Sequence, residues 1–154
     1  MNHETVDTFE SSIYENINFI SRYKKLYAKY NNWDNRISKI DKKEVSSILE
    51  TYNYPFKYVD STYYCKESIE SYTFHIAIQV KGGIPILTFN IEKDNVFYPL
   101  TGHNLTRAYK LLLNLETALI VTFIDYEQLN EIMKEYLRIY EDFKIEFLNQ
   151  VKVI

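Results

Sequence analysis

The chain has 154 residues, of which 46% are hydrophobic, 25% charged and 16% aromatic, and its net charge is −3. This composition is typical of one compact domain and excludes a disordered chain, because a domain of this length buries a core without a metal or a disulfide. No apolar run reaches the ~20 residues that cross a bilayer, and the N-terminus lacks a signal-peptide pattern, so we expect a cytoplasmic protein without membrane contact.

Residue usage and turn residues indicate a single unit. Ile, Tyr, Lys and Asn are abundant while Ala and Arg are scarce, a bias typical of AT-rich genes, so we expect a low-GC bacterium or one of its phages as the source. The 3 Gly and 3 Pro are isolated, and no repeat or linker divides the chain. We therefore predict one domain over residues 1–154.

The N-terminal third has helical periodicity. Apolar residues recur every three or four positions from Val6 to Tyr30, which predicts one long amphipathic helix. Residues 31–40 lose this period and are expected to form a connection. Asp41 and Glu44 have the spacing of a capping box, so a short helix is expected to follow, to about residue 52.

The central third changes to the period of a strand. Apolar and polar residues alternate over 72–81, and Gly82-Gly83 is typical of a two-residue hairpin turn. The register set by this turn places apolar side chains opposite one another on one face and His75 opposite Asn90 on the other.

Two further segments extend the predicted sheet. Residues 56–65 are rich in Tyr, Val and Thr and are expected to form a strand. A second turn at Lys93-Asp94 would bring three more apolar residues, Val96, Tyr98 and Leu100, to the buried face. Pro99 favours a position for this strand at the edge of the sheet.

The C-terminal third returns to helical periodicity. A helix is expected over about 105–115, and Asp125 to Gln128 has the spacing of a capping box that opens a long helix. Residues 118–124 fit either a strand or a helix, and their β-branched side chains favour a strand. The sequence thus predicts an α+β fold, an antiparallel β-meander of three to five strands packed on one face by N- and C-terminal amphipathic helices.

Negative charge gathers in the C-terminal helix. Residues 116–146 hold eight acids against three bases, and five of the acids share one helix face, which we call the acidic ridge. The acidic ridge consists of Glu127, Glu131, Glu135, Asp142 and Glu146. It suits a basic protein partner such as a toxin or nuclease, and with His75 and Asn90 on the polar sheet face it forms the predicted partner-binding surface.

Nucleic-acid or nucleotide binding is the alternative function. Residues 21–43 hold eight bases against two acids with aromatic residues between them, a pattern that can contact phosphates and stack on bases. The candidate contacts are Arg22, Lys24, Lys25 and Lys29. A helix start at 101–107 offers free amides to an anion, although the same residues also fit a plain cap and turn. Its candidate residues are Thr101, Gly102, His103, Asn104 and Arg107.

The sequence shows no catalytic or metal-binding pattern. Three His and Cys65 are scattered without the spacing of a zinc site, and no carboxylate pair lies in an apolar segment. We therefore predict a non-enzymatic protein that uses no metal or cofactor and binds another protein. An immunity protein or phage-type inhibitor that neutralises a toxin or nuclease is the form of this function that we expect.

Overall fold

The structure, a computed structural model, describes residues 6–97 and 103–153. The described helices are α1 (Thr8–Asn16), α2 (Phe19–Lys29), α3 (Lys42–Glu50), α4 (Leu105–Leu113) and α5 (Tyr126–Val153), with a 3-10 turn, η1, at Trp33–Asn35. The strands are β1 (Lys57–Val59), β2 (Thr62–Ile69), β3 (Tyr72–Lys81), β4 (Ile84–Lys93) and β5 (Val96–Phe97). They form one antiparallel sheet in the order β1-β2-β3-β4-β5, which confirms the predicted α+β meander.

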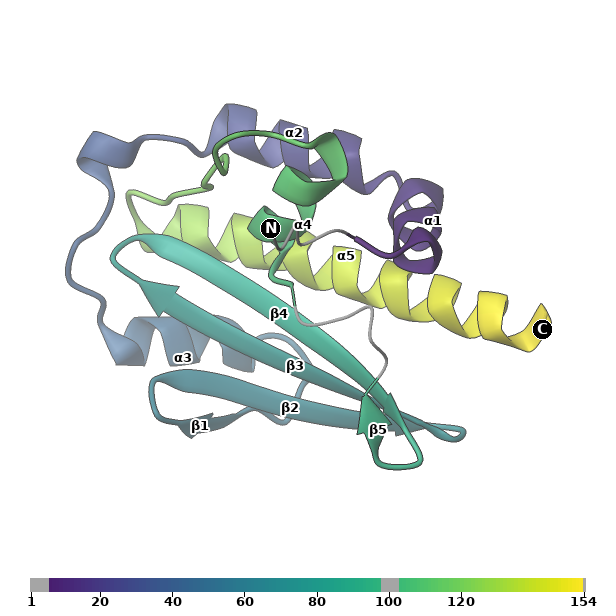
Figure 1. The fold of residues 1–154 in the computed structure, drawn as a ribbon. Coiled ribbons are helices and arrows are strands. Elements are labelled where there is room, and N and C mark those ends of the chain that lie inside the picture. The colour runs from purple at the N-terminus through teal and green to yellow at the C-terminus, as the bar shows by residue number, and fades with distance from the viewer. Residues whose placement is uncertain (1–5, 98–102, 154) are drawn as a thin grey trace.

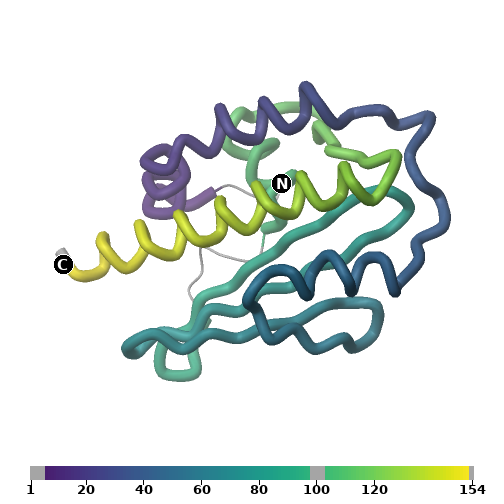
Figure 2. The backbone as a smooth tube through the Cα atoms, turned by 180° about the vertical axis from the view of Figure 1, so that it is seen from behind, coloured from purple at the N-terminus to yellow at the C-terminus, as the bar shows by residue number. Residues whose placement is uncertain are grey.

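The helices cover one face of the sheet (Figure 1). On α5, Phe143 contacts Phe89 of β4 with ring centroids 4.7 Å apart, and Phe147 contacts Phe74 of β3 at 5.9 Å. Seen from behind, α5 and α3 lie in front of the strands (Figure 2). Among the described residues no helix lies over the opposite face, which we call the open face.

The β3–β4 hairpin has the predicted register. Gly82 and Gly83 form its turn with φ angles of 52° and 79°. Ile76 pairs with Phe89 on the core face, and His75 pairs with Asn90 on the open face. Two glycines at positive φ and a strict two-residue alternation favour the register that buries Phe74, Ile76, Ile78, Leu87, Phe89 and Ile91 together.

The β4–β5 hairpin differs from the prediction. Its turn is formed by Asp94 and Asn95, with φ angles of 55° and 66°, and Lys93 pairs with Val96. The predicted pairing of Val96 with Ile91 is therefore wrong, and Val96 is 68% exposed. Asp and Asn adopt positive φ more readily than Lys, so the turn lies at Asp94-Asn95 instead of Lys93-Asp94. This shift of one residue in the turn changes the partner of each β5 residue by two positions, so that Val96 pairs with Lys93 instead of Ile91. The other predicted strand residues, 98–100, lie outside the described residues.

Residues 56–65 form a hairpin rather than one strand. Asp60 and Ser61, with φ angles of 50° and 62°, turn the chain between β1 and β2. The Tyr, Val and Thr residues on both sides of this turn favour extended structure, so composition alone does not separate the two strands.

The predicted helix from Val6 to Tyr30 is two helices. Asn18 separates α1 from α2 with a φ of 58°, a left-handed conformation that Asn tolerates better than most residues. The break brings Tyr14 and Phe19 together, with ring centroids 4.7 Å apart in the core. Both helices bury apolar residues at the predicted spacing, but the bend between them lets α1 and α2 pack against the core in different directions.

Residues 118–124 are neither strand nor helix. Their backbone groups bind partners from separate parts of the chain: Thr122 N donates to Tyr30 O, Phe123 N donates to Gly83 O, and Phe123 O accepts from Ile37 N. The side chain of Phe123 is fully buried. The apolar, β-branched composition of the segment therefore reflects burial rather than a strand, and the strand prediction is wrong.

Among the described residues, no helix combines the length and the apolar character needed to cross a membrane.

Candidate functional site

The acidic ridge lies against the N-terminal helices. Arg22 of α2 donates from Nε to Glu135 and from Nη1 to Asp142, each at 2.7 Å. Lys29 lies 3.7 Å from Glu131, whose carboxylate also accepts a hydrogen bond from Tyr30. Asn16 donates to Glu146 at 3.1 Å, and Glu127 is exposed at the start of α5. Four of the five ridge residues that were predicted to contact a partner thus bind α1, α2 and the residue that follows α2, Tyr30.

These contacts change the electrostatic character of the ridge. The hydrogen bond from Tyr30 and the nearby Lys29 lower the pKa of Glu131. Arg22 is neutralised by two acids at once, and its side chain is 21% exposed. Part of the ridge and part of the basic segment, predicted from the sequence as two separate surfaces, therefore contact each other through Arg22 and Lys29.

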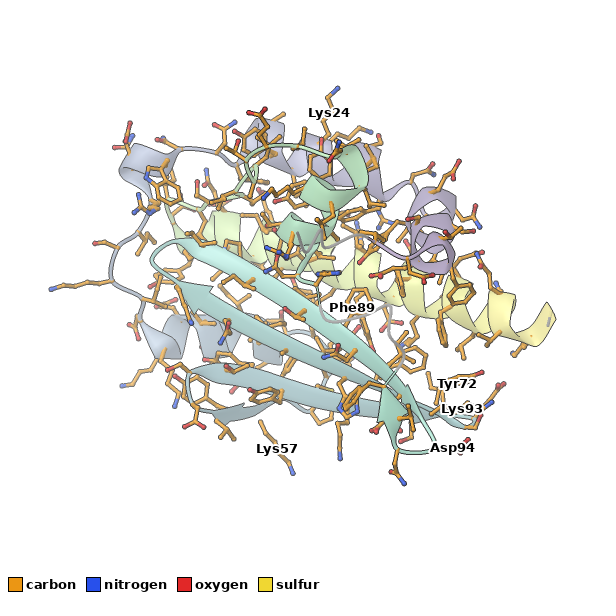
Figure 3. All side chains as sticks on the ribbon, viewed as in Figure 1. Lys24, Lys57, Tyr72, Phe89, Lys93 and Asp94 are labelled. Atoms are coloured by element: carbon orange, nitrogen blue, oxygen red, sulfur yellow. The ribbon has the colours of Figure 1, made fainter. Side chains whose placement is uncertain are left out.

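The basic segment 21–43 does not present an aromatic surface. Tyr23 is buried, and its hydroxyl donates to Leu119 O and lies 2.7 Å from the Thr106 hydroxyl; Tyr30 is also buried. Trp33 is 45% exposed, but its ring is covered by the Arg36 guanidinium at 3.7 Å. Lys24 and Lys25 are exposed, and Figure 3 shows Lys24 directed away from the helices.

At the start of α4, Asn104 forms the helix cap. Its side chain accepts a hydrogen bond from Arg107 N at 2.8 Å, so one of the amides considered for an anion is already bound. His103 is partly buried, whereas Thr101 and Gly102 lie outside the described residues.

Cys65 and His75 lie on opposite faces of the sheet. Cys65 pairs with Ile76 and is 3% exposed on the core face, whereas His75, one residue along β3, lies on the open face. Burial and the neighbouring Glu67 carboxylate raise the pKa of the Cys65 thiol, which disfavours the reactive thiolate. Among the described residues, no three His, Cys, Asp or Glu side chains are arranged to hold a metal ion.

An ion network joins β2 to α5. Lys144, with a side chain 9% exposed, lies 2.9 Å from both Glu67 and Glu141. Tyr140 donates to Glu67 at 2.6 Å, and Tyr54 donates to Glu141. Burial lowers the pKa of Lys144, but hydrogen bonds to the two carboxylates outweigh it and raise the pKa overall. Sequence analysis missed this network, because its members lie on three elements far apart in the chain.

A groove lies over α5 beside this network. It has a volume of 690 Å³. Its charged lining residues are Arg22, Glu67, Lys134, Arg138, Glu141 and Asp142. Three cations and three carboxylates compensate one another, so the groove shows no preference for a ligand of either charge.

The open face carries exposed aromatic side chains around a contact between a histidine and a glutamate. His75 Nε2 lies 2.6 Å from Glu92 Oε1, and its ring lies 5.4 Å from that of Phe97. Phe97 is 54% exposed, and Tyr64, which pairs with Ala77 on the same face, is 46% exposed. Asn90 lies beside His75 and is partly buried. The two sheet residues predicted for partner binding thus lie at the centre of a larger exposed surface.

Positive charge surrounds these aromatic side chains. Lys57 pairs with Tyr64, Lys66 pairs with His75, and Lys81 lies at the end of β3, all on the open face. Within the described part of the chain these lysines are exposed and form no ion pair, and Figure 3 shows Lys57 directed outward from β1. A groove of 390 Å³ beside Tyr64, Lys66 and His75 is lined mostly by apolar atoms.

Sequence analysis did not identify Tyr64, Phe97, Lys57 or Lys66 as site residues. The alternation of Tyr64, Lys66 and Ser68 along β2 was an available signal, since residues two apart share a face. It could be assigned to the open face only once the register with β3 was known.

Comparison with known proteins finds no protein-family model, no curated protein and no solved structure that matches this chain.

Proposed function

We propose that this protein is a non-enzymatic binding domain that docks onto another protein through its open face. The observation that carries this proposal is a sheet whose described helices all cover one face, with Tyr64 and Phe97 exposed on the other around the His75–Glu92 pair. Aromatic side chains on a rigid sheet bury a large area at a small cost in conformational entropy, and they are enriched among the residues that dominate binding.

The charge of the open face points to an acidic surface on the partner. Lys57, Lys66 and Lys81 form no ion pair with any residue that the structure describes, whereas Glu92 is hydrogen-bonded to His75. Charge complementarity steers association and selects partners. The basic partner expected from the acidic ridge has less support, because three of the five ridge acids, Glu131, Glu135 and Asp142, already pair with Arg22 or Lys29 within the chain.

An inhibitor of the immunity-protein or phage type is the role we propose for this binding domain. Neutralising a toxin or nuclease by direct contact requires a rigid surface and no chemistry of its own. The β3–β4 pair, with its fixed register and its core-face residues Phe74, Ile76, Leu87 and Phe89 buried, supplies such a surface.

Single-stranded nucleic acid is the competing ligand, because lysines and exposed aromatic side chains also bind bases and phosphates. We favour a protein, since the net charge of −3 repels a polyanion at long range. In addition, Tyr23 and Tyr30 of the basic segment are buried and provide no second stacking surface.

The test is to capture the partner with the wild-type protein and with two double variants. Y64A/F97A removes both exposed aromatic side chains, and K24A/K25A is the matched control on α2. We expect one protein from the native host to be enriched by the wild type and the control but not by Y64A/F97A. With the purified partner, Y64A/F97A should weaken binding at least about tenfold.

Two results would contradict this proposal. The first is a captured partner that binds Y64A/F97A as tightly as the wild type, with both proteins showing the same thermal unfolding. The second is binding of generic single-stranded RNA or DNA near physiological salt, with an affinity that falls steeply with salt and depends on Tyr64 and Phe97.

A further inference from the structure

β1 covers only the first part of β2. The pairs Lys57–Tyr64, Tyr58–Tyr63 and Val59–Thr62 account for the whole contact between the two strands. Among the described residues, no strand pairs with Cys65–Ile69 on the side away from β3. Figure 1 shows β2 continuing past the place where β1 begins. The sheet therefore ends in a free edge that is about five residues long.

The turns identify which backbone groups point out of this edge. Val59 and Thr62 flank a two-residue turn and so form a hydrogen-bonded pair, which directs the even-numbered residues of β2 toward β1. The turn at residues 70–71 agrees, because Ile69 and Tyr72 flank it and pair within the β2–β3 hairpin. The N–H and C=O groups of Lys66 and Ser68 therefore point outward, beyond the first residue of β1, and Lys66 O accepts only a long contact of 3.9 Å from Cys65 Sγ among the described residues.

The apolar groove beside Tyr64, Lys66 and His75 lies next to this edge, where β1 begins. Its lining includes Pro55 before β1, Tyr64 and Cys65 on β2, and His75 on β3, and its volume is 390 Å³. That volume is enough for a large apolar side chain. Lys57 and Lys66 line the same groove, are exposed and have no ion-pair partner in the described part of the chain.

We propose that the partner binds by adding an extended strand to the free edge of β2, with an apolar side chain in this groove and acidic side chains beside Lys57 and Lys66. This inference rests on the proposed function and specifies how the partner is recognised. Main-chain hydrogen bonds to Lys66 and Ser68 supply affinity, while the groove and the lysines select the sequence of the added strand.

Edge lysines also explain why the occupant is an acidic strand rather than a second copy of this chain. Edge-to-edge pairing of two copies would bring Lys57 and Lys66 of each copy near those of the other, and exposed edge lysines are a common device against such pairing. A strand with carboxylates turns the same lysines into attractive contacts.

Ser68→Pro and Ser68→Ala form a matched pair for the test. Both remove the hydroxyl, but only proline removes the outward N–H, and proline is tolerated at the outer side of an edge strand. A displayed library of random linear peptides is selected against the wild type. We expect the enriched peptides to alternate apolar and acidic residues, to bind S68A like the wild type, and to bind S68P about tenfold or more weakly.

Two further measurements keep the result interpretable if S68P fails to fold. Hydrogen exchange in the wild type should show the amides of residues 66 and 68 becoming protected when a selected peptide binds. K66E should weaken the acidic peptides, whereas K24E, on the exposed side of α2, should leave their affinity unchanged.

Several outcomes would overturn edge pairing. They are a selection that enriches no peptide, peptides that bind S68P as well as S68A, protection at amides other than those of residues 66 and 68, and a wild-type dimer that S68P dissociates. If the captured partner binds S68P normally but is lost with Y64A/F97A, edge pairing is wrong while the proposed function stands. If S68P loses the partner and Y64A/F97A retains it, the edge is the site and the open face is not.

Discussion

Lys144 of α5 and Glu67 of β2 form an ion pair of 2.9 Å at the contact between the helix and the sheet. The same ammonium group lies 2.9 Å from Glu141, so one cation compensates two carboxylates. Removing it leaves both acids near each other and partly shielded from water.

We therefore expect Lys144→Met to destabilise the protein by about 3 kcal/mol. The matched control is Lys152→Met, which breaks an exposed pair with Glu70 and should cost less than about 1 kcal/mol. Urea unfolding at neutral pH measures both values. Equal effects of the two substitutions would show that the buried network contributes no more than a surface pair.

Glu10 makes stability depend on pH. Its side chain is 1% exposed, its Oε2 atom has no hydrogen-bond partner among the described residues, and burial together with Asp7 raises its pKa from 4.5 to about 8. The native state thus holds a proton that the unfolded state releases above pH 4.5. Stability from this group is complete below pH 4.5 and is lost as the pH rises toward about 8.

Glu10→Gln removes this titration while keeping the shape of the side chain. The stability of the variant relative to the wild type should increase between pH 4.5 and about 8, by an amount on the order of 4 kcal/mol. Urea unfolding across that range tests it. A constant difference between the two proteins would mean that Glu10 is ionised in the native state.

Gly83 is required by both its conformation and its surroundings. Its φ is +79°, and a Cβ atom there would lie 2.7 Å from Arg36 Cβ and 2.8 Å from the backbone oxygen of Ile37. Gly83→Ala should cost about 2 to 3 kcal/mol. Gly82 provides the control, because it also has a positive φ but no atom within 4 Å of a built Cβ.

Gly82→Ala should therefore cost only about 1 kcal/mol, the conformational penalty alone. Thermal or urea unfolding separates the two effects. If both substitutions cost the same, the close approach of residues 36–37 to the turn does not constrain the hairpin.

Arg22 should matter for stability rather than for binding. It joins α2 to Glu135 and Asp142 of α5, and its side chain is partly buried. Arg22→Ala should cost about 1 to 2 kcal/mol, whereas Lys25→Ala, at an exposed position on the same helix, should cost almost nothing. Neither should change affinity for the captured partner. If Arg22→Ala weakened the complex without lowering stability, the acidic ridge would be part of the partner-binding surface.

Local signals in the sequence determined much of the fold. Two glycines and a strict alternation fix the β3–β4 register, since a slip of one residue would expose Phe89 and Ile76. The side chain of Asp125 accepts from Gln128 N at 2.8 Å, as the predicted cap at the start of α5 requires. The cap depends on residues three positions apart, and the hairpin depends on one continuous segment, so both are visible in the linear order.

The tertiary structure alone decided which of the predicted surfaces are free. Helical periodicity places Glu135 and Asp142 on one face of α5, but whether water or Arg22 meets that face depends on α2, more than 100 residues away in the chain. Alternation likewise places His75 on a polar face, yet only the packing of every described helix on the other side leaves that face open. Contacts between distant elements arise from how apolar faces bury one another, and the local pattern of each element does not specify its neighbour.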